Sequence, residues 1–291
     1  MSRTILVTGS QSQLGCELQS LVQQHSSPTD WTWHFASHNG LDITDSDALS
    51  FFCDKYSINT IINGAAYTAV DKAESEFRKA DLVNHIAVKN LALIAKARSI
   101  SLVHISTDYV FDGNQNHPYR ETDIPHPINA YGRSKLAGEQ AMQAINPPRS
   151  AILRSGWLYS SSGNNFVKTI LRLCQSQKEL HVVNDQTGTP THARLLASTI
   201  IKLIPTLQYS ETELLHYSQT GQCTWYEFAC AIAVHTHLPC QINPISTQNY
   251  GSAATRPYYS VLDHSALAER LSLAIPHWQD TLATHLYLTK P

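Results

Sequence analysis

Short apolar runs, each followed by a longer segment of helical periodicity, recur along the first half of this sequence. Strands joined by helices in this way run parallel, because a parallel crossover needs a connection of a dozen residues or more. The pattern predicts an α/β fold, a doubly wound parallel sheet of the Rossmann type with a smaller C-terminal substrate-binding domain. The predicted strands cover residues 5–8, 33–37, 60–63, 102–106 and 151–154, and the predicted helices cover residues 14–24, 45–56, 80–98 and 129–145.

The regular alternation ends near residue 160, beyond which prolines interrupt the pattern. A length of 291 residues suits one large unit with a smaller one. We expect residues 1–160 to form a dinucleotide-binding domain that later segments complete. Residues 161–291 would then form mainly the substrate-binding domain, interleaved with the first.

Charge and hydropathy exclude several classes of protein. The 21 Lys and Arg residues against 23 Asp and Glu residues give a net charge of −2, which argues against nucleic acid as a partner. No apolar run approaches the roughly 18 residues that cross a bilayer, and no secretory leader pattern is present, so a cytoplasmic protein is expected. The six cysteines form no C-x-x-C pair, and we predict reduced thiols and no protein-built metal site.

The turn after the first predicted strand has part of a glycine-rich phosphate-binding pattern. Gly9 and Gly15 flank a strand-to-helix turn, where a pyrophosphate rests against the N-terminus of the helix. Ser12 stands where a middle glycine would allow the closest approach of the phosphate. Either the Ser12 hydroxyl donates to a phosphate oxygen or the affinity for the cofactor suffers. Without further support, an ordinary Gly-Ser turn explains this stretch equally well.

The end of the second predicted strand bears on the choice of cofactor. A carboxylate here would favour NAD by accepting from the 2′-hydroxyl of the ribose, but the sequence after this strand reads Ser37-His38-Asn39. Nothing repels a 2′-phosphate, so we predict that NADPH is accepted, with NADH as a second cofactor. No arginine is present at this place either, and the preference is expected to be modest.

Tyr131 and Lys135 have the spacing of a catalytic pair. Residues four apart on a helix project from one face, so the ammonium group can lie near the phenol and lower its pKa towards neutrality. The spacing alone is weak, since chance matches are common. Its position carries more weight, because the pair opens the helix after the fourth strand and Thr107 stands just past the end of that strand.

Five stretches of the sequence carry a resemblance to a known enzyme family. The chain resembles the extended short-chain dehydrogenase/reductases and is most similar to the dTDP-4-dehydrorhamnose reductase family, from Ile5 to about Trp278. The stretches, in the family's order and spacing, are NGAAYTAVDKAE (63–74), STDYVFDG (106–113), PYRETDIPHPINAYGRSKLAGE (118–139), NDQTGTPT (184–191) and ATRPYYSVLD (254–263).

The resemblance implies an activity and a set of catalytic residues. The activity is the NAD(P)H-dependent reduction of the C4 keto group of dTDP-4-dehydro-6-deoxy-L-mannose to dTDP-L-rhamnose, a step of nucleotide-sugar and polysaccharide biosynthesis. The family's triad falls on Thr107, Tyr131 and Lys135. Tyr131 would protonate the developing alkoxide, Lys135 would hold the nicotinamide ribose, and Thr107 would polarise the carbonyl.

The resemblance also implies contacts with cofactor and substrate. Trp157 would lie against the sugar, although a core tryptophan is a fair alternative. Asn165, Gln186 and Arg256 are candidates for the nucleotide-sugar, since a diphosphate calls for amide or guanidinium donors. The expected cofactor contacts are Gly9, Ser12, Gln13, Leu14, Ser37, Asp42, Ile43, Ala65, Ala66, Thr68, Tyr131 and Lys135.

One departure from the family bears on assembly. Some members dimerise around Mg²⁺ held by carboxylates, one of which matches Glu17, while another falls where this chain has Arg194. A cation at a ligand position adds repulsion and supplies no oxygen. We therefore predict no structural Mg²⁺ and a monomer or a weak homodimer.

The sequence also bears on three other functions. A 4,6-dehydratase would have an Asp-Glu pair after the triad threonine, whereas Thr107 is followed by Asp108 and Tyr109. A regulatory, non-catalytic role like that of the methionine adenosyltransferase β subunit is disfavoured by the intact triad, although Ser12 points towards it. A reductase of a related dTDP-keto sugar, such as the dihydrostreptose type, is a further alternative, because the sequence of the pocket residues does not identify the sugar.

Overall fold

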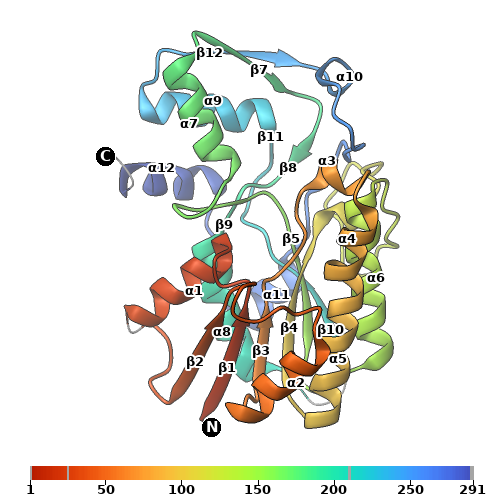
Figure 1. Ribbon diagram of the computed structural model, residues 1–291. Helices are drawn as coiled ribbons and strands as arrows, with labels where there is room; N and C mark the ends of the chain where they lie inside the picture. The colour runs from red at the N-terminus through yellow and green to blue at the C-terminus, as the bar shows by residue number, and fades with distance from the viewer. Residues whose placement is uncertain (1, 25, 209–210, 289–291) are drawn as a thin grey trace.

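The structure is a computed structural model that describes residues 2–24, 26–208 and 211–288. Within these ranges six strands form one parallel sheet in the order β10-β5-β4-β3-β1-β2 (Figure 1). The order reverses between β1 and β3, the place where ligands bind in doubly wound sheets. The predicted fold class is confirmed. The bounds of these strands are β1 Arg3–Thr8, β2 Trp31–Ala36, β3 Thr60–Asn63, β4 Ser101–Thr107, β5 Ala151–Ser155 and β10 Glu213–His216.

Helices cover both faces of this sheet, which is why its strands read as nearly continuous apolar runs. Ile5 and Val7 of β1 face one apolar cluster, with α1 (Gln13–Gln23) and α8 (Ala193–Leu203). Leu6, between them in sequence, faces the opposite cluster, with α2 (Ser46–Lys55), α5 (Ala87–Arg98) and α6 (Ala130–Ile145). Burial of both clusters fixes the layers of the fold.

The helix predicted over residues 80–98 is not continuous, and this prediction is wrong in detail. The structure has α4 (Phe77–Asp81), a π-helical turn η1 (Leu82–Ile86) and then α5. Within the π-turn the buried Asn84 side chain accepts from the Tyr67 amide at 2.9 Å and donates to the Tyr67 carbonyl at 3.0 Å. The wider turn therefore tethers the loop after β3, as π-turns often do near functional sites. The other predicted elements lie within two residues of the observed ones.

A smaller unit is built from the second half of the chain, at the top of Figure 1. Its apolar core joins α7 (Phe166–Ser176), α9 (Trp225–Thr236) and α12 (Trp278–Leu288) beside the parallel pair β7 (Glu179–Val183) and β12 (Gln241–Ile245). Between these segments the chain returns to the large sheet through α8 and β10. The remaining elements are α3 (Val70–Ala73), η2 (Asp108–Val110), β6 (Leu158–Tyr159), β8 (Thr187–Gly188), β9 (Thr191–His192), η3 (Ile204–Thr206), β11 (Cys223–Thr224), α10 (Thr247–Tyr250) and α11 (Ser265–Arg270).

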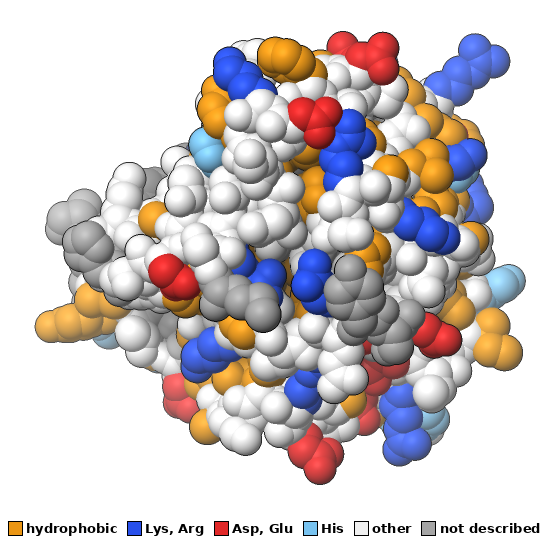
Figure 2. Space-filling view, turned by 90° about the horizontal axis from the view of Figure 1, so that it is seen from below, with side chains coloured by type: hydrophobic (Ala, Val, Ile, Leu, Met, Phe, Trp, Pro, Cys, Tyr) orange, Lys and Arg blue, Asp and Glu red, His pale blue; other side chains and the backbone are white. Residues whose placement is uncertain are grey.

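The surface agrees with the balanced charge of the sequence. Figure 2 shows the end of the molecule below the sheet, where Lys and Arg side chains are interspersed with Asp and Glu side chains. None of the helices in the described ranges is long and apolar enough to span a membrane.

A buried ion pair joins α6 to the sheet. Arg154 of β5 donates to both carboxylate oxygens of Glu139, with an Nη2 to Oε2 distance of 2.6 Å, and each side chain is about 1–2% exposed. Ser106 of β4 donates to the same carboxylate. The middle of α6 is thereby held against the ends of β4 and β5.

Removing one member of this ion pair is predicted to destabilise the fold. Glu139→Ala leaves the buried Arg154 guanidinium without its carboxylate, and we expect a loss of about 3–5 kcal/mol in the free energy of unfolding. Urea denaturation measures this. Asp54→Ala breaks the exposed pair of Asp54 with Arg98 and serves as the control, with a much smaller expected change. Equal losses in the two variants would contradict the prediction.

Candidate active site

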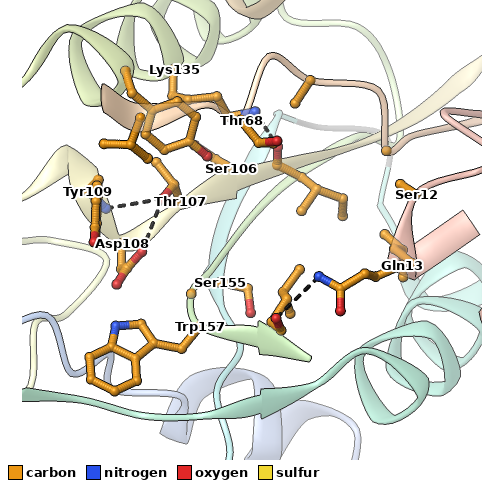
Figure 3. Close-up of a pocket in the computed structure, with 18 of the residues that line it drawn as sticks. Ser12, Gln13, Thr68, Ser106, Thr107, Asp108, Tyr109, Lys135, Ser155 and Trp157 are labelled. Carbon is orange, nitrogen blue, oxygen red and sulfur yellow. Dashed lines mark hydrogen bonds between the residues drawn. The ribbon is translucent and has the colours of Figure 1, made fainter. Parts of the chain in front are cut away.

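A groove crosses the carboxyl ends of the parallel strands. It consists of a cavity of about 570 Å³ beside β4, β5 and α6 and a second cavity of about 390 Å³ beside β1, β2 and β3. Both cavities are lined by Gln11, Ser12, Gly64, Ala66 and Thr68, so together they form one elongated site. A close view of the first cavity is given in Figure 3.

The glycine turn forms the wall between the two cavities. Gly9 has a φ of +67°, and a Cβ at this position would lie 2.7 Å from the Ala65 amide nitrogen, so only glycine fits. Ser12 is the N-cap of α1, and its Oγ accepts from the Gly15 amide at 3.1 Å. Its side chain is thus held by the helix and does not fill the groove. The hydroxyl hydrogen is left available to a ligand.

The second cavity gathers residues expected to contact the adenosine half of a dinucleotide. Ser37, Asp42 and Ile43 line it together with Ala65 and Ala66. Hydrogen bonds from the backbone and hydroxyl of Thr44 keep the pKa of Asp42 below its usual value. Every residue predicted to contact the cofactor lines one of the two cavities, and binding itself stays a prediction.

Thr107, Tyr131 and Lys135 meet in the first cavity. Thr107 ends β4, while Tyr131 lies in the first turn of α6, which the Asn129 side chain caps by accepting from the Gly132 amide at 2.7 Å. A Cβ at position 132 would lie 2.1 Å from the Tyr109 carbonyl oxygen. This close approach lets the helix start beside the end of β4.

The predicted fall in the pKa of Tyr131 is wrong. The Lys135 ammonium donates to the Ile105 carbonyl at 2.6 Å and lies 3.4 Å from His104 Nε2. Burial raises the pKa of Tyr131 to about 12, although a hydrogen bond with the Thr107 side chain opposes the rise. Burial also lowers the pKa of Lys135 to about 8, against the attraction of Glu139. Desolvation outweighs the attraction between charges here, because both groups leave water on entering the fold.

A buried polar chain beneath Lys135 was not predicted from the sequence. Thr8 donates to Asn63 at 2.6 Å, and the Asn63 amide lies 3.0 Å from His104 Nδ1. Burial and the neighbouring Lys135 hold the pKa of His104 well below its usual value, so the imidazole is neutral. The sequence held one signal of this chain, since Thr8, Asn63 and His104 are polar residues near the ends of three otherwise apolar strands.

Asp108 is a second residue of the first cavity that the sequence analysis did not place at the site. It is 3% exposed, it lines the first cavity, and its Oδ1 accepts from the Thr107 hydroxyl at 3.0 Å. Burial raises the pKa of its carboxyl to about 6, although hydrogen bonds from the Ser260 and Thr107 side chains lower it in part. The signal in the sequence was a carboxylate next to the triad threonine.

Trp157 lies where the two units of the fold meet. It lines the first cavity, has a φ of +51° and stacks on Trp225 with ring centroids 3.4 Å apart. Trp225, which the sequence analysis missed, also lines a third cavity of about 330 Å³ beside α7 and β7. The predicted tryptophan is therefore at the cavity wall.

The three predicted nucleotide-sugar residues are separated by the structure. Gln186 and Arg256 line the third cavity, whereas Asn165 caps α7 and donates to Gln13 at 3.0 Å. The guanidinium of Arg256 is already paired with another side chain of the chain. It forms a two-pronged ion pair with Asp71, at 2.7 and 3.1 Å.

Glu17 and Arg194, the positions considered for Mg²⁺, pair with one another at 3.6 Å. Burial raises the pKa of Glu17, and the guanidinium of Arg194 opposes this rise. In the described parts of the chain, no group of three or more His, Cys, Asp or Glu residues could hold a metal ion.

Comparisons with known proteins agree with this geometry. Residues 3–289 match the family model described as RmlD substrate binding domain. A dTDP-4-dehydrorhamnose reductase of Aggregatibacter actinomycetemcomitans is 38% identical, over 96% of each chain. A dTDP-4-keto-6-deoxy-D-glucose reductase of Streptomyces niveus is 37% identical, over 95% of this chain and 94% of the relative.

A solved structure extends the likeness to three dimensions. The dTDP-4-dehydrorhamnose reductase of Bacillus anthracis in complex with NADP has a TM-score of 0.93 and 37% identity. The match covers 99% of this chain and all of that one.

The burial of Asp108 leads to a prediction about stability and pH. The carboxyl of Asp108 has a pKa of about 6 in the folded protein, against about 3.9 for an unfolded aspartate. At a pH between these two values, the folded protein keeps a proton that the unfolded chain has released. Stability therefore falls as the pH rises through this window. We expect Asp108→Asn to be more stable than the wild type above about pH 6, by roughly 1–3 kcal/mol, with the gain shrinking as the pH falls from about 6 to about 4 and absent below that.

Urea denaturation of both proteins across this pH range measures the gain. Asp280→Asn, which changes an exposed carboxylate in the first turn of α12, is the control and should show no such pH profile. A gain that does not depend on pH would contradict the prediction.

Proposed function

The chain belongs to the RmlD substrate-binding-domain family, and from this premise we propose that it reduces the C4 keto group of dTDP-4-dehydrorhamnose to give dTDP-L-rhamnose. The observation that carries the proposal is the meeting of Thr107, Tyr131 and Lys135 in one cavity at the end of a dinucleotide-sized groove. Nucleotide-sugar biosynthesis is the corresponding pathway class.

The groove fits NADPH. Gly9 allows a phosphate to approach the backbone, and the N-terminus of α1 offers amide groups and a positive dipole end. Ser37 ends the second strand without a carboxylate that would repel a 2′-phosphate, so NADPH is accepted and NADH serves as a second cofactor. When bound, the reduced cofactor supplies the hydride that the keto carbon receives.

Tyr131 supplies the proton. A phenol whose pKa burial raises to about 12 stays protonated at neutral pH. An alkoxide is a much stronger base than a phenolate, so proton transfer from Tyr131 to the reduced carbonyl oxygen is downhill. Thr107 can turn its hydroxyl from Asp108 towards this oxygen and polarise it. Lys135 is fixed by the Ile105 carbonyl and would hold a ribose hydroxyl beside the phenol.

A second candidate is the reduction of an isomeric keto sugar. It is favoured by the relative named dTDP-4-keto-6-deoxy-D-glucose reductase, which is 37% identical. Both reactions would use the same groove and the same triad. They differ only in the configuration of the sugar ring that the enzyme accepts. The complete triad argues against a purely regulatory role.

We also propose a cytoplasmic location and the division of the chain near residue 160. The substrate-binding unit would take the nucleotide at the third cavity, where Gln186 and Arg256 lie. Asn165 would act from the cap of α7 through Gln13, which lines the first cavity.

Product analysis tests the proposed function. We expect the protein with NADPH to convert dTDP-4-dehydrorhamnose to dTDP-L-rhamnose, identified by NMR, and to use NADH with no more than a modest change in rate. Tyr131→Phe removes the proton donor and should lower turnover on the order of 100-fold or more while cofactor binding is retained. Wild-type turnover in this variant would contradict the role of Tyr131, and no product from the wild type would contradict the function.

Assembly gives a separate prediction. Because Arg194 pairs with Glu17, we propose a monomer or weak homodimer that Mg²⁺ does not stabilise. Sedimentation velocity with Mg²⁺ and with a chelator should give the same profile. A dimer that forms only with Mg²⁺ would refute this proposal.

A further inference from the structure

A row of buried polar side chains ends at Lys135. Thr8, Asn63 and His104 come from the neighbouring strands β1, β3 and β4, and each of them is at most 1% exposed. Lys135, itself 1% exposed, lies at the wall of the first cavity (Figure 3). Because every donor in such a buried row must meet an acceptor, the hydrogen bonds determine where each proton lies.

The distances in this row set its direction. Thr8 Oγ1 and the side-chain oxygen of Asn63 are 2.6 Å apart, a length typical of a hydroxyl donor and short for an amide donor. The oxygen of the Asn63 amide therefore faces Thr8, and its nitrogen donates to His104 Nδ1 at 3.0 Å. A ring nitrogen that accepts carries no proton, so the neutral His104 ring carries its proton on Nε2.

His104 Nε2 lies 3.4 Å from the nitrogen of Lys135. The same nitrogen donates to the Ile105 carbonyl at 2.6 Å, which fixes its place. A neutral amine has a lone pair that accepts from the ring N–H, whereas an ammonium group has only donors and is repelled by it. The contact with His104 therefore acts in the same direction as the burial that lowers the pKa of Lys135 to about 8.

We propose that His104 is a positioning residue: with its proton held on Nε2 by Asn63 and Thr8, it stabilises the neutral amine of Lys135. The His104 side chain is fully buried, so it acts through Lys135 and not by contact with a ligand. The other titratable groups around Lys135 are Tyr131 and Glu139 of α6 and Asp108 and Tyr109 of η2.

This contact bears on the proposed reductase function. Tyr131 becomes a phenolate once it has given its proton, and a positive charge one turn further along α6 stabilises that phenolate. The ammonium form of Lys135 is therefore the active form, and activity falls as the pH rises through the pKa of Lys135. His104 thus sets the alkaline limit of the reaction. The alkaline limit rests on the proposed function, whereas the effect of His104 on Lys135 does not.

The position of the His104 proton is observed directly by NMR. In protein labelled with nitrogen-15 histidine, a protonated ring nitrogen and an unprotonated one differ widely in chemical shift. We expect Nε2 to carry the proton in the wild type at about pH 7. A proton on Nδ1 would overturn the proposal.

Thr8→Val tests the effect on Lys135. The substitution keeps the size of the side chain but removes the hydroxyl that orients Asn63, so the amide can turn its oxygen towards His104 Nδ1. The ring proton then moves to Nδ1, and Nε2 accepts from the Lys135 ammonium group. We expect the pKa of Lys135, followed through the carbon-13 shift of its Cε, to rise by about one pH unit, as for loss of one hydrogen bond. The alkaline limit of kcat/KM should rise equally.

Thr60→Val is the matched control. Thr60 is also a buried threonine, but it lies at the opposite end of β3 from Asn63. This variant should keep the pKa of Lys135 and the pH profile of the wild type. An unchanged pKa of Lys135 in Thr8→Val, or equal shifts in the two variants, contradicts the proposal.

Activity and NMR separate this inference from the proposed function. If the pKa of Lys135 rises in Thr8→Val while the alkaline limit stays in place, His104 does not set that limit. A wild type without reductase activity overturns the proposed function, while the NMR measurements still decide whether His104 acts on Lys135.

Discussion

The carboxyl edge of the parallel sheet is the constraint on which the rest of this structure depends. Along their length the strands lie between two apolar layers, and a polar side chain there has no water to pair with. At the edge the strands emerge from these layers, and Thr107 and Ser155 stand at the ends of neighbouring strands. The buried pair of Glu139 and Arg154 holds α6 against the same edge. The chemistry of the site is thus placed by the packing of the sheet.

Burial at this edge sets the protonation states more strongly than the attraction between charges does. It raises the pKa of Tyr131 to about 12 and that of Asp108 to about 6, and it lowers the pKa of Lys135 to about 8. A phenol that keeps its proton suits a reduction, in which the enzyme must donate a proton to a strong base. The same desolvation makes the site costly to maintain, as stability and activity often oppose each other at functional sites.

Two distant parts of the chain meet around the groove. Trp157 follows β5 of the large sheet and stacks on Trp225 at the start of α9. Arg256 reaches back to Asp71 beside the loop after β3. These contacts join the smaller unit to the large sheet. They would therefore fix the position of a nucleotide-sugar in the third cavity relative to the reacting groups in the first.

The sequence by itself determined the parallel sheet, its flanking helices and the place of Thr107, Tyr131 and Lys135, because apolar periodicity and helical spacing are local properties. It also located the glycine turn, although the capping role of Ser12 appeared only in the structure. Tertiary structure alone decided the pKa of Tyr131, the ion pair of Arg256, the π-turn at Asn84 and the unpaired oxygen of Asp108. Each of these depends on burial or on a partner far away in the chain, and neither can be read from neighbouring residues.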